Sequence, residues 1–139
     1  GIYFITNDNQ IVINYPKQHY DSITEKSRQT HGNFKQIVRL FKNIKDDLIE
    51  RKIINNGTVK SYFIENWLYN APNACFVGNY SDQFNNILDW FISCERNNSL
   101  QKWICANKVD ALVSDKNWQL NNLKQFLTAL IKIRNENKF

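Results

Sequence analysis

The stretch from residue 33 to residue 52 limits most strongly what this chain can fold into. Its apolar residues recur at spacings of three and four, the pattern of an α-helix that buries one face. These residues are Phe34, Ile37, Val38, Phe41, Ile44, Leu48 and Ile49. We therefore predict a helix from Asn33 to about Lys52 whose apolar side packs against the rest of the chain.

Three further helices are expected along the chain. One begins near Ser61 and must end before Pro72, because the residue preceding a proline avoids the helical region. Ser81 and Asp82 are placed to cap the next helix. The last helix is defined by Leu123, Phe126, Leu127, Leu130 and Ile131. Between these two helices, the apolar stretch 103–113 fits neither the helical nor the strand period, and its structure stays open.

Two short apolar runs near the N-terminus predict a β-hairpin. The runs 3–5 and 11–13 flank the turn-forming residues 7–9, and Pro16 ends the second run. No internal repeat, low-complexity tract or glycine-rich linker follows. The expected fold is mainly α: a single helical bundle over residues 1–139 with a short N-terminal β-hairpin.

The composition bounds the partners and the compartment. The chain has 139 residues and a formal charge of +5, which favours anionic partners such as nucleotides, nucleic acid or an acidic protein. No apolar run approaches the roughly 20 residues that cross a bilayer, and the N-terminus lacks signal-peptide features, so we expect a cytoplasmic protein. The three cysteines show no CxxC spacing and are expected to be reduced. The absence of Met predicts a piece of a longer chain.

Most signatures of a self-contained enzyme are absent from the sequence. The four glycines lie too far apart to form a phosphate-binding loop. His19 and His31 are not spaced as metal ligands on one helix face, so each is expected to be a surface or capping residue. No Asp-x-Asp pair exists that could hold Mg²⁺, and the adjacent Asp46 and Asp47 point in different directions on a helix. We expect no metal site and no catalytic residue in this chain.

A stripe of basic residues runs beside the apolar face of the first long helix. Lys35, Arg39 and Lys42 are spaced by four and then three residues, so they lie on one side of that helix. Like charges so placed repel by roughly a few tenths of a kcal/mol per pair, and a bound triphosphate would reverse that repulsion. The alternative is a solvated surface in which Lys42 pairs with Asp46, one turn further on.

The start of the second helix is a further candidate for anion binding. Ser61 follows the turn-forming residues 55–57, and the first N–H groups of a helix and its dipole both favour an anion. Lys60 adds positive charge beside it. The alternative is that Ser61 only caps the helix, a contribution of about 1 kcal/mol, and that Tyr62 is an aromatic at the edge of the core.

Several of these segments resemble the helical domain of cGAS/DncV-like nucleotidyltransferases. The first is the run 14–20, followed by Lys26, Thr30 and the runs 34–35 and 38–42. The second is the run 60–65, followed by the Tyr-Asn-x-Pro-Asn turn at 69–73. The resemblance covers residues 11–76, and beyond it only helix lengths and scattered aromatic residues agree.

The resemblance implies a fold and an activity for the parent protein. Such enzymes join an N-terminal α/β catalytic core to a C-terminal helical domain of the poly(A) polymerase and oligoadenylate synthetase type. They link nucleoside triphosphates, such as ATP and GTP, into cyclic or linear signalling products, and many bacterial relatives serve in anti-phage defence. Their metal-binding aspartates precede the segment that this chain resembles. Mg²⁺ is therefore expected in a catalytic core outside this chain, on its N-terminal side.

The resemblance also implies roles for single residues. Lys42 matches the helix lysine that contacts the triphosphate, Ser61 the serine that joins it, and Tyr62 the aromatic residue that stacks on a base. Lys35 and Arg39 are secondary candidates, because either could pair with acidic groups of the catalytic core. Two other functions stay open: a basic module that binds RNA or DNA, and a purely structural interaction domain.

Overall fold

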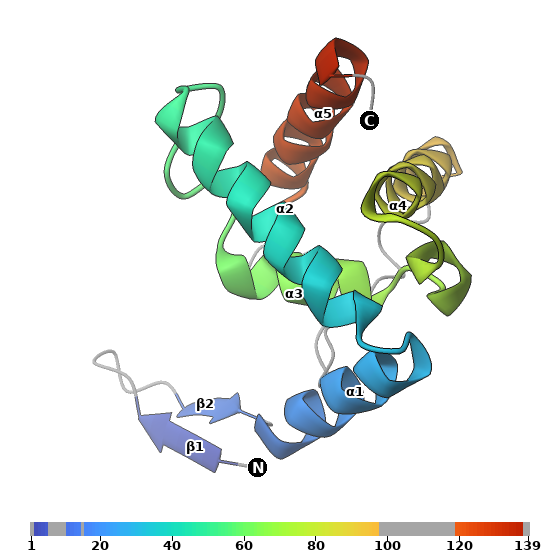
Figure 1. Ribbon diagram of the computed structural model, residues 1–139. Coiled ribbons are helices and arrows are strands. Elements are labelled where there is room, and N and C mark those ends of the chain that lie inside the picture. The colour runs from blue at the N-terminus through green and yellow to red at the C-terminus, as the bar shows by residue number, and fades with distance from the viewer. Residues whose placement is uncertain (1, 6–10, 15, 98–118, 138–139) are drawn as a thin grey trace.

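The computed structural model of the protein describes residues 2–5, 11–14, 16–97 and 119–137. In chain order, the elements are the strands β1 (Ile2–Ile5) and β2 (Ile11–Asn14), the helices α1 (Pro16–Gln29), α2 (Asn33–Glu50) and α3 (Ser61–Tyr69), the short 3₁₀ helix η1 (Asn73–Phe76), and the helices α4 (Tyr80–Arg96) and α5 (Leu120–Asn137) (Figure 1). The described part of the chain is therefore mainly helical.

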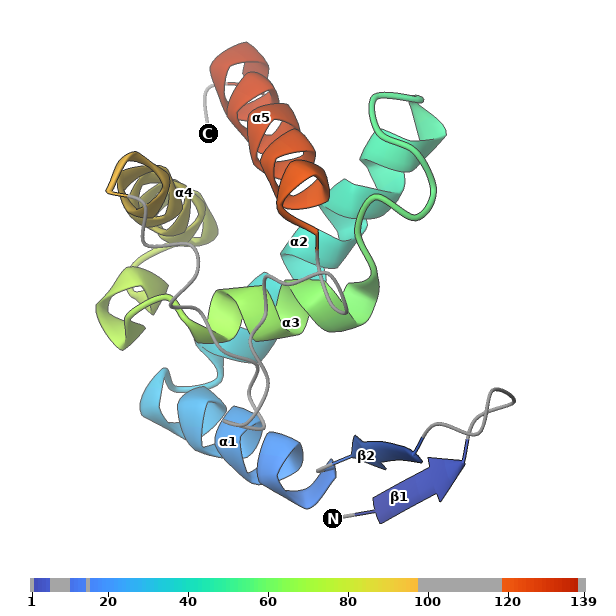
Figure 2. The same ribbon diagram turned by 180° about the vertical axis from the view of Figure 1, so that it is seen from behind.

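The two strands pair with each other in an antiparallel register. Ile2 lies opposite Asn14, and Ile5 lies opposite Ile11. Figures 1 and 2 show this pair beside the start of α1, at the opposite end of the molecule from α5. The strands therefore lie outside the group of helices that forms the core.

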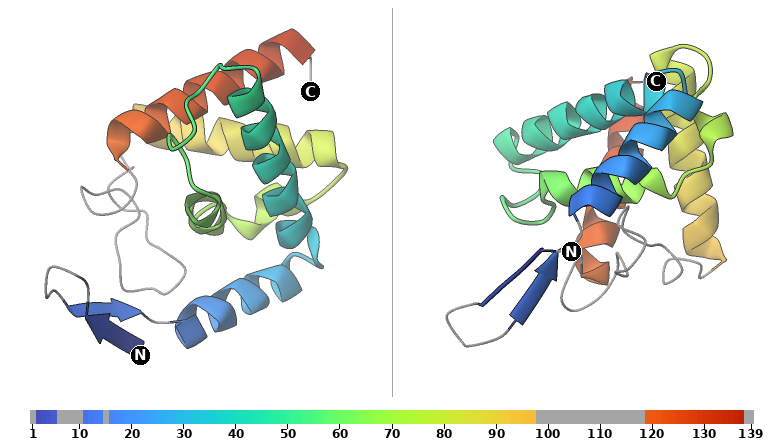
Figure 3. Two further views of the ribbon diagram at one scale, coloured as in Figure 1. Left: turned by 90° about the vertical axis from the view of Figure 1, so that its left-hand side faces the viewer. Right: turned by 90° about the horizontal axis from the view of Figure 1, so that it is seen from below.

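Helix α3 runs through the middle of the molecule. The left view of Figure 3 looks along α3 and shows α1, α2, α4 and α5 arranged around it. Its Trp67 is fully buried and stacks on Phe91 of α4, with ring centroids 4.1 Å apart. Phe41 of α2 and Phe126 of α5 contact the same indole at 6.0 and 5.7 Å. One side chain of α3 thus joins three other helices, and truncating it to alanine would cost about 3–5 kcal/mol.

The helices expected from apolar periodicity are present as α2, α3, α4 and α5. On α2, the predicted face is buried at Phe34, Ile37 and Phe41, each with no exposed surface. The predicted cap of α4 is wrong: the helix begins at Tyr80, and the Asn79 side chain accepts a hydrogen bond of 2.8 Å from the Asp82 backbone N–H. Ser81 and Asp82 thus lie inside the first turn. The stretch 103–113 falls outside the described residues.

Helix α1 has no apolar periodicity and is not among the helices expected from the sequence. Its buried side chains are Ser22, Ile23, Lys26 and, just past its end, Thr30, of which only Ile23 is apolar. The remaining cue is Pro16 at the first helical position, where proline is favoured because its missing N–H needs no partner there. A helix that buries polar side chains cannot be recognised from hydrophobic spacing alone.

Two sequence expectations concern membranes and cysteines. None of the helices in the described residues is both long and apolar enough to span a membrane. Cys75 and Cys94 are partly buried thiols that form no disulfide bond within the described residues, and Cys105 lies outside these residues. Burial raises the pKa of the Cys75 thiol, so this side chain is less reactive than an exposed cysteine.

Candidate functional site

A lysine of α2 contacts the first residue of α3. The Lys45 ammonium donates a hydrogen bond of 2.9 Å to the Ser61 hydroxyl. The Lys45 side chain is 12% exposed, and its ammonium also lies 3.4 Å from the carboxylate of Asp46, which is 71% exposed. A lysine whose side chain is mostly buried therefore places its ammonium at the start of α3, with one exposed carboxylate beside it.

The connection between α2 and α3 is what brings these two residues together. At the end of α2, Lys52 adopts a left-handed backbone conformation with φ of 59°. The Lys52 and Ile53 N–H groups then bond to the carbonyls of Ile49 and Leu48, an arrangement that terminates helices and reverses the chain. Val59, only 3% exposed, fixes the returning segment just before Ser61. The start of α3 is thereby held against the last turns of α2.

Ser61 is not the cap of α3. The preceding residue, Lys60, occupies the cap position with φ −95° and ψ 150°, and its side chain makes no capping hydrogen bond. Ser61 is the first helical residue, so its hydroxyl is available to bond with Lys45. The positive end of the helix dipole and the cation of Lys45 lie together here, an arrangement that an anion would stabilise.

The basic residues expected from sequence all lie on α2 but differ in burial and in neighbours. Lys42 is partly buried one turn before Lys45, and within the described part of the chain it forms no hydrogen bond or ion pair, so the pair with Asp46 that the alternative interpretation requires is absent. Lys35 is exposed. Arg39 is also exposed and lines a cavity of about 190 Å³ on another side of α2, together with Tyr80. That cavity shares no residue with the contact between Lys45 and Ser61.

Tyr62 lies next to Ser61 and is backed by a histidine. The Tyr62 side chain is 47% exposed, and the His19 ring of α1 stacks against it with centroids 5.6 Å apart and planes at 24°. His19 Nε2 lies 2.8 Å from a carboxylate oxygen of Glu65. The expectation that His19 is a surface or capping residue is therefore wrong, because its ring is partly buried between two residues of α3. His31 is exposed in the turn after α1.

Lys45 is not among the residues expected to bind a ligand, although the sequence contains one signal for it. Lys45 follows Phe41 by four residues and precedes Leu48 by three, so it lies in the middle of the apolar stripe of α2. A charged residue at such a position must find a polar partner or lose its hydration without compensation. The partner is 16 residues away in sequence and cannot be identified from helical spacing.

Comparison with known proteins identifies the family. Residues 21–135 match the cGAS/DncV-like nucleotidyltransferase C-terminal helical domain. The chain belongs to this family. A cyclic nucleotide synthase of Staphylococcus haemolyticus is 37% identical over 98% of this chain and 46% of its own length. The cyclic UMP-AMP synthase of Rhodothermus marinus is 32% identical over 90% of this chain and 42% of its own length.

Solved structures of such synthases share the fold of this helical domain. The Rhodothermus marinus CdnE c-UMP-AMP synthase with Apcpp and Upnpp superposes with a TM-score of 0.88 at 30% identity, over 96% of this chain and 45% of that one. The Elizabethkingia meningoseptica CdnE cyclic dinucleotide synthase with GTP and Apcpp gives 0.84 at 31% identity, over 100% and 50%. The chain thus spans about half the length of the relatives it matches.

At its other end, α3 of this cGAS/DncV-like domain receives a second lysine. Lys26 is only 7% exposed. Its ammonium donates hydrogen bonds of 2.6 Å to the Ala71 carbonyl and 3.0 Å to the Asn73 side chain. It also lies 5.2–5.8 Å from the ring centroids of Phe34, Tyr69 and Phe76. Burial lowers the pKa of this ammonium to about 8.

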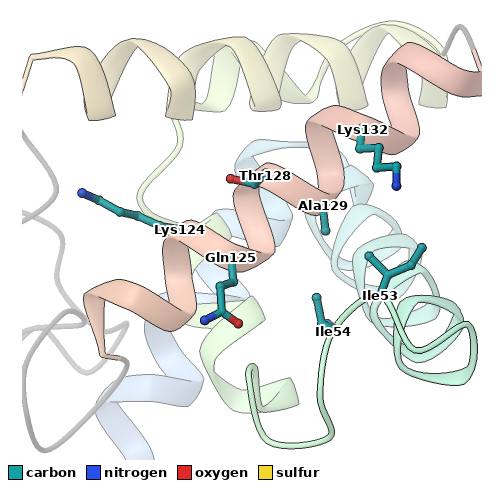
Figure 4. Close-up of a pocket in the computed structure, with 7 residues that line it drawn as sticks. All are labelled: Ile53, Ile54, Lys124, Gln125, Thr128, Ala129 and Lys132. Atoms are coloured by element: carbon teal, nitrogen blue, oxygen red, sulfur yellow. The ribbon is translucent and has the colours of Figure 1, made fainter.

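A separate cavity of about 350 Å³ lies between α5 and the segment that follows α2. Figure 4 shows Ile53 and Ile54 reaching toward Ala129, while Lys132 points toward the two isoleucines and Lys124 points away from them. The two ammonium groups do not converge, so this cavity of the cGAS/DncV-like domain is a poorer anion site than the start of α3. Among the described residues, no three His, Cys, Asp or Glu side chains come together as metal ligands.

Proposed function

We propose that this chain is the nucleotide-positioning half of a cyclic nucleotide synthase, and that Lys45 and Ser61 bind the triphosphate of a substrate. The observation that carries the proposal is the 2.9 Å contact between Lys45 and Ser61 at the start of α3. It combines a cation, a hydroxyl and the positive end of a helix in one place. Each of these groups favours a phosphate, and nothing anionic other than Asp46 pairs with Lys45 among the described residues.

The comparisons support nucleotides as the ligand class. The family matched over residues 21–135 is a nucleotidyltransferase family, and the similar synthase structures are those with Apcpp and Upnpp and with GTP and Apcpp. Formation of a cyclic or linear product by the whole protein is part of the proposal, because this chain spans only about half of those relatives. A role in anti-phage defence is a proposal that rests on the resemblance alone.

The other candidate residues have supporting roles in this proposal. Lys42 lies one turn before Lys45 on α2 and could extend the positive charge toward the outer phosphates. Tyr62 offers an exposed aromatic face beside Ser61, and base stacking on such a face contributes about 1–3 kcal/mol with little base preference. Lys35 and Arg39, both exposed, are better placed to contact acidic groups of a catalytic core than to join Ser61.

Metal chemistry belongs in the other half of the enzyme under this proposal. The described residues bring no group of carboxylates to the start of α3, so Mg²⁺ would be held by a catalytic core. A metal held there would supply charge neutralisation at the phosphates and activation of the attacking hydroxyl. The residues of this chain hold the triphosphate and the base in place, and they contribute proximity and orientation.

The proposal is tested by the kinetics of the full-length enzyme. We expect Lys45→Ala to raise KM for nucleoside triphosphates about tenfold, because a charge-assisted hydrogen bond contributes about 1.5–3 kcal/mol. Ser61→Ala should raise KM about threefold, and Lys42→Ala less than Lys45→Ala. The control is Lys132→Ala, an exposed lysine of α5 that should leave KM unchanged.

Three results would contradict the proposal or redirect it. An unchanged KM in both Lys45→Ala and Ser61→Ala would remove the triphosphate assignment. A larger effect of Lys42→Ala than of Lys45→Ala would move the assignment to Lys42. Salt-sensitive binding of long RNA or DNA that depends on Lys35 and Arg39, with nucleotide kinetics intact, would favour the nucleic-acid module instead.

A further inference from the structure

The environment of Tyr62 suggests a role for a residue on another helix. His19 belongs to α1, yet its ring stacks on Tyr62 of α3 at 5.6 Å with an interplanar angle of 24°. This geometry is the offset stacking that aromatic rings prefer. Tyr62 is still 47% exposed, so the contact supports its ring without burying it.

Glu65 fixes the orientation of the histidine ring. Its carboxylate lies 2.8 Å from His19 Nε2, and it follows Tyr62 by three residues, which places both side chains on one face of α3. The side chains of His19 and Glu65 are 22% and 25% exposed, so the pair is partly shielded from water. The other ring nitrogen, Nδ1, is buried without a hydrogen-bond partner among the described residues. The contacts with Glu65 and Tyr62 are thus the ones that orient the ring.

A supported tyrosine is a better platform for a base than a mobile one. Immobilising a side chain on binding costs about 0.5–1.5 kcal/mol, and a ring that is already fixed avoids much of this cost. Ser61 precedes Tyr62 directly, so a nucleotide whose phosphates bind at Ser61, as proposed above, would have its base close to the next residue of α3. The orientation of the Tyr62 ring therefore decides whether both contacts form together.

We propose that His19, oriented by Glu65, is a positioning residue that holds the Tyr62 ring where it receives the base of a nucleoside triphosphate. This inference rests on the proposed function, because it needs the phosphates to bind beside Ser61. His19 contacts neither the base nor the phosphates, and it acts through Tyr62. The alternative is a purely structural link between α1 and α3.

Inorganic triphosphate separates these two roles, because it has phosphates but no base. In the full-length enzyme, we expect His19→Ala to raise KM for nucleoside triphosphates about three- to tenfold while kcat changes less than about twofold. The inhibition constant of inorganic triphosphate should be the same for His19→Ala as for the unaltered enzyme. His19→Phe, which preserves a ring behind Tyr62, should recover most of the lost affinity. Gln18→Ala, the exposed neighbour on α1, is the matched control.

A double variant completes the test. In a Tyr62→Ala background, His19→Ala should have no further effect on KM, since the ring it supports is gone. The inference is overturned if His19→Ala leaves KM unchanged or if it weakens the binding of inorganic triphosphate as much as the binding of nucleotides. It is also overturned if His19→Ala still raises KM in the Tyr62→Ala background. Failure of the proposed function looks different, because Lys45→Ala would then leave inhibition by inorganic triphosphate unchanged.

Discussion

The two ends of α3 each receive a lysine from an earlier helix, but the two lysines are placed in opposite electrostatic settings. Lys26 lies at the C-terminal end, where the helix dipole favours a cation and two oxygen atoms accept its hydrogen bonds. Lys45 lies at the N-terminal end, where the dipole disfavours a cation. The first lysine is satisfied by the protein itself. The charge of Lys45 is less fully compensated by the protein and can therefore attract an anionic ligand. This difference distinguishes a structural lysine from a ligand-binding one.

The largest effect that tests this comparison is a loss of stability at the C-terminal end. Lys26→Ala should destabilise the protein by about 2–3 kcal/mol, because it leaves the Ala71 carbonyl without its donor and removes the cation from three rings. Urea unfolding measures this loss. Lys17→Ala, whose side chain is 92% exposed, should stay within about 0.5 kcal/mol of the unaltered protein. Equal losses in both variants would break the comparison.

The next effect is on stabilisation by ligand at the N-terminal end. A nonhydrolysable triphosphate at one hundred times its Kd should stabilise the full-length enzyme by about 2.7 kcal/mol. If Lys45→Ala weakens binding tenfold, the same ligand concentration stabilises by only about 1.4 kcal/mol. Thermal unfolding with and without ligand measures the difference, and Lys132→Ala is the control. Full ligand stabilisation in Lys45→Ala would show that this lysine holds no phosphate.

A pH effect follows from the burial of Lys26. Because burial lowers its pKa to about 8, the unfolded chain binds more protons than the folded one between about pH 8 and the ordinary lysine pKa near 10.5. The free energy of unfolding should therefore rise with pH through that range, because the cost of burying the charged ammonium of Lys26 becomes smaller. Relative to Lys26→Met, the gain between pH 7.5 and pH 9 is on the order of 1 kcal/mol. Urea unfolding at both pH values measures the difference in free energy of unfolding between the unaltered protein and Lys26→Met. A difference that is the same at both pH values would contradict this expectation.

The smallest effect concerns the carboxylate beside Lys45. Asp46 lies 3.4 Å from the ammonium and is mostly exposed, so it competes only weakly with a phosphate. Asp46→Asn should lower KM for nucleoside triphosphates by about twofold. The adjacent Asp47, which pairs with Arg51, supplies the control Asp47→Asn. An increase of KM in Asp46→Asn would mean that this carboxylate helps to orient Lys45 rather than compete for it.

Hydrophobic spacing predicts those helices that bury apolar faces, and it fails where buried residues are polar. The faces of α2, α3, α4 and α5 could be recognised because side chains such as Phe41 and Trp67 repeat with the helical period. Helix α1 could not, because it buries Ser22 and Lys26. Their partners lie far away in sequence, as in the bond from Lys26 to Ala71, and no local pattern encodes such pairs.

The candidate site shows the same division. The start of α3, with Ser61 and Tyr62, was recognisable from a turn followed by a helix and from the family resemblance. The lysine that contacts Ser61 is Lys45 and not Lys42, and the choice depends on the angle at which α2 and α3 pack. The supporting ring of His19 comes from α1, a helix that the sequence pattern does not reveal.

The shortness of α3 limits where the chain can change in length during evolution. The helix has nine residues and extends about 13 Å, with its two ends held by lysines of different helices. One inserted residue would shift one end by about 1.5 Å and rotate it by about 100°, which would separate either Lys26 or Lys45 from its partner. Insertions and deletions should therefore be rare within residues 61–73 and commoner in the exposed turn at residues 55–57.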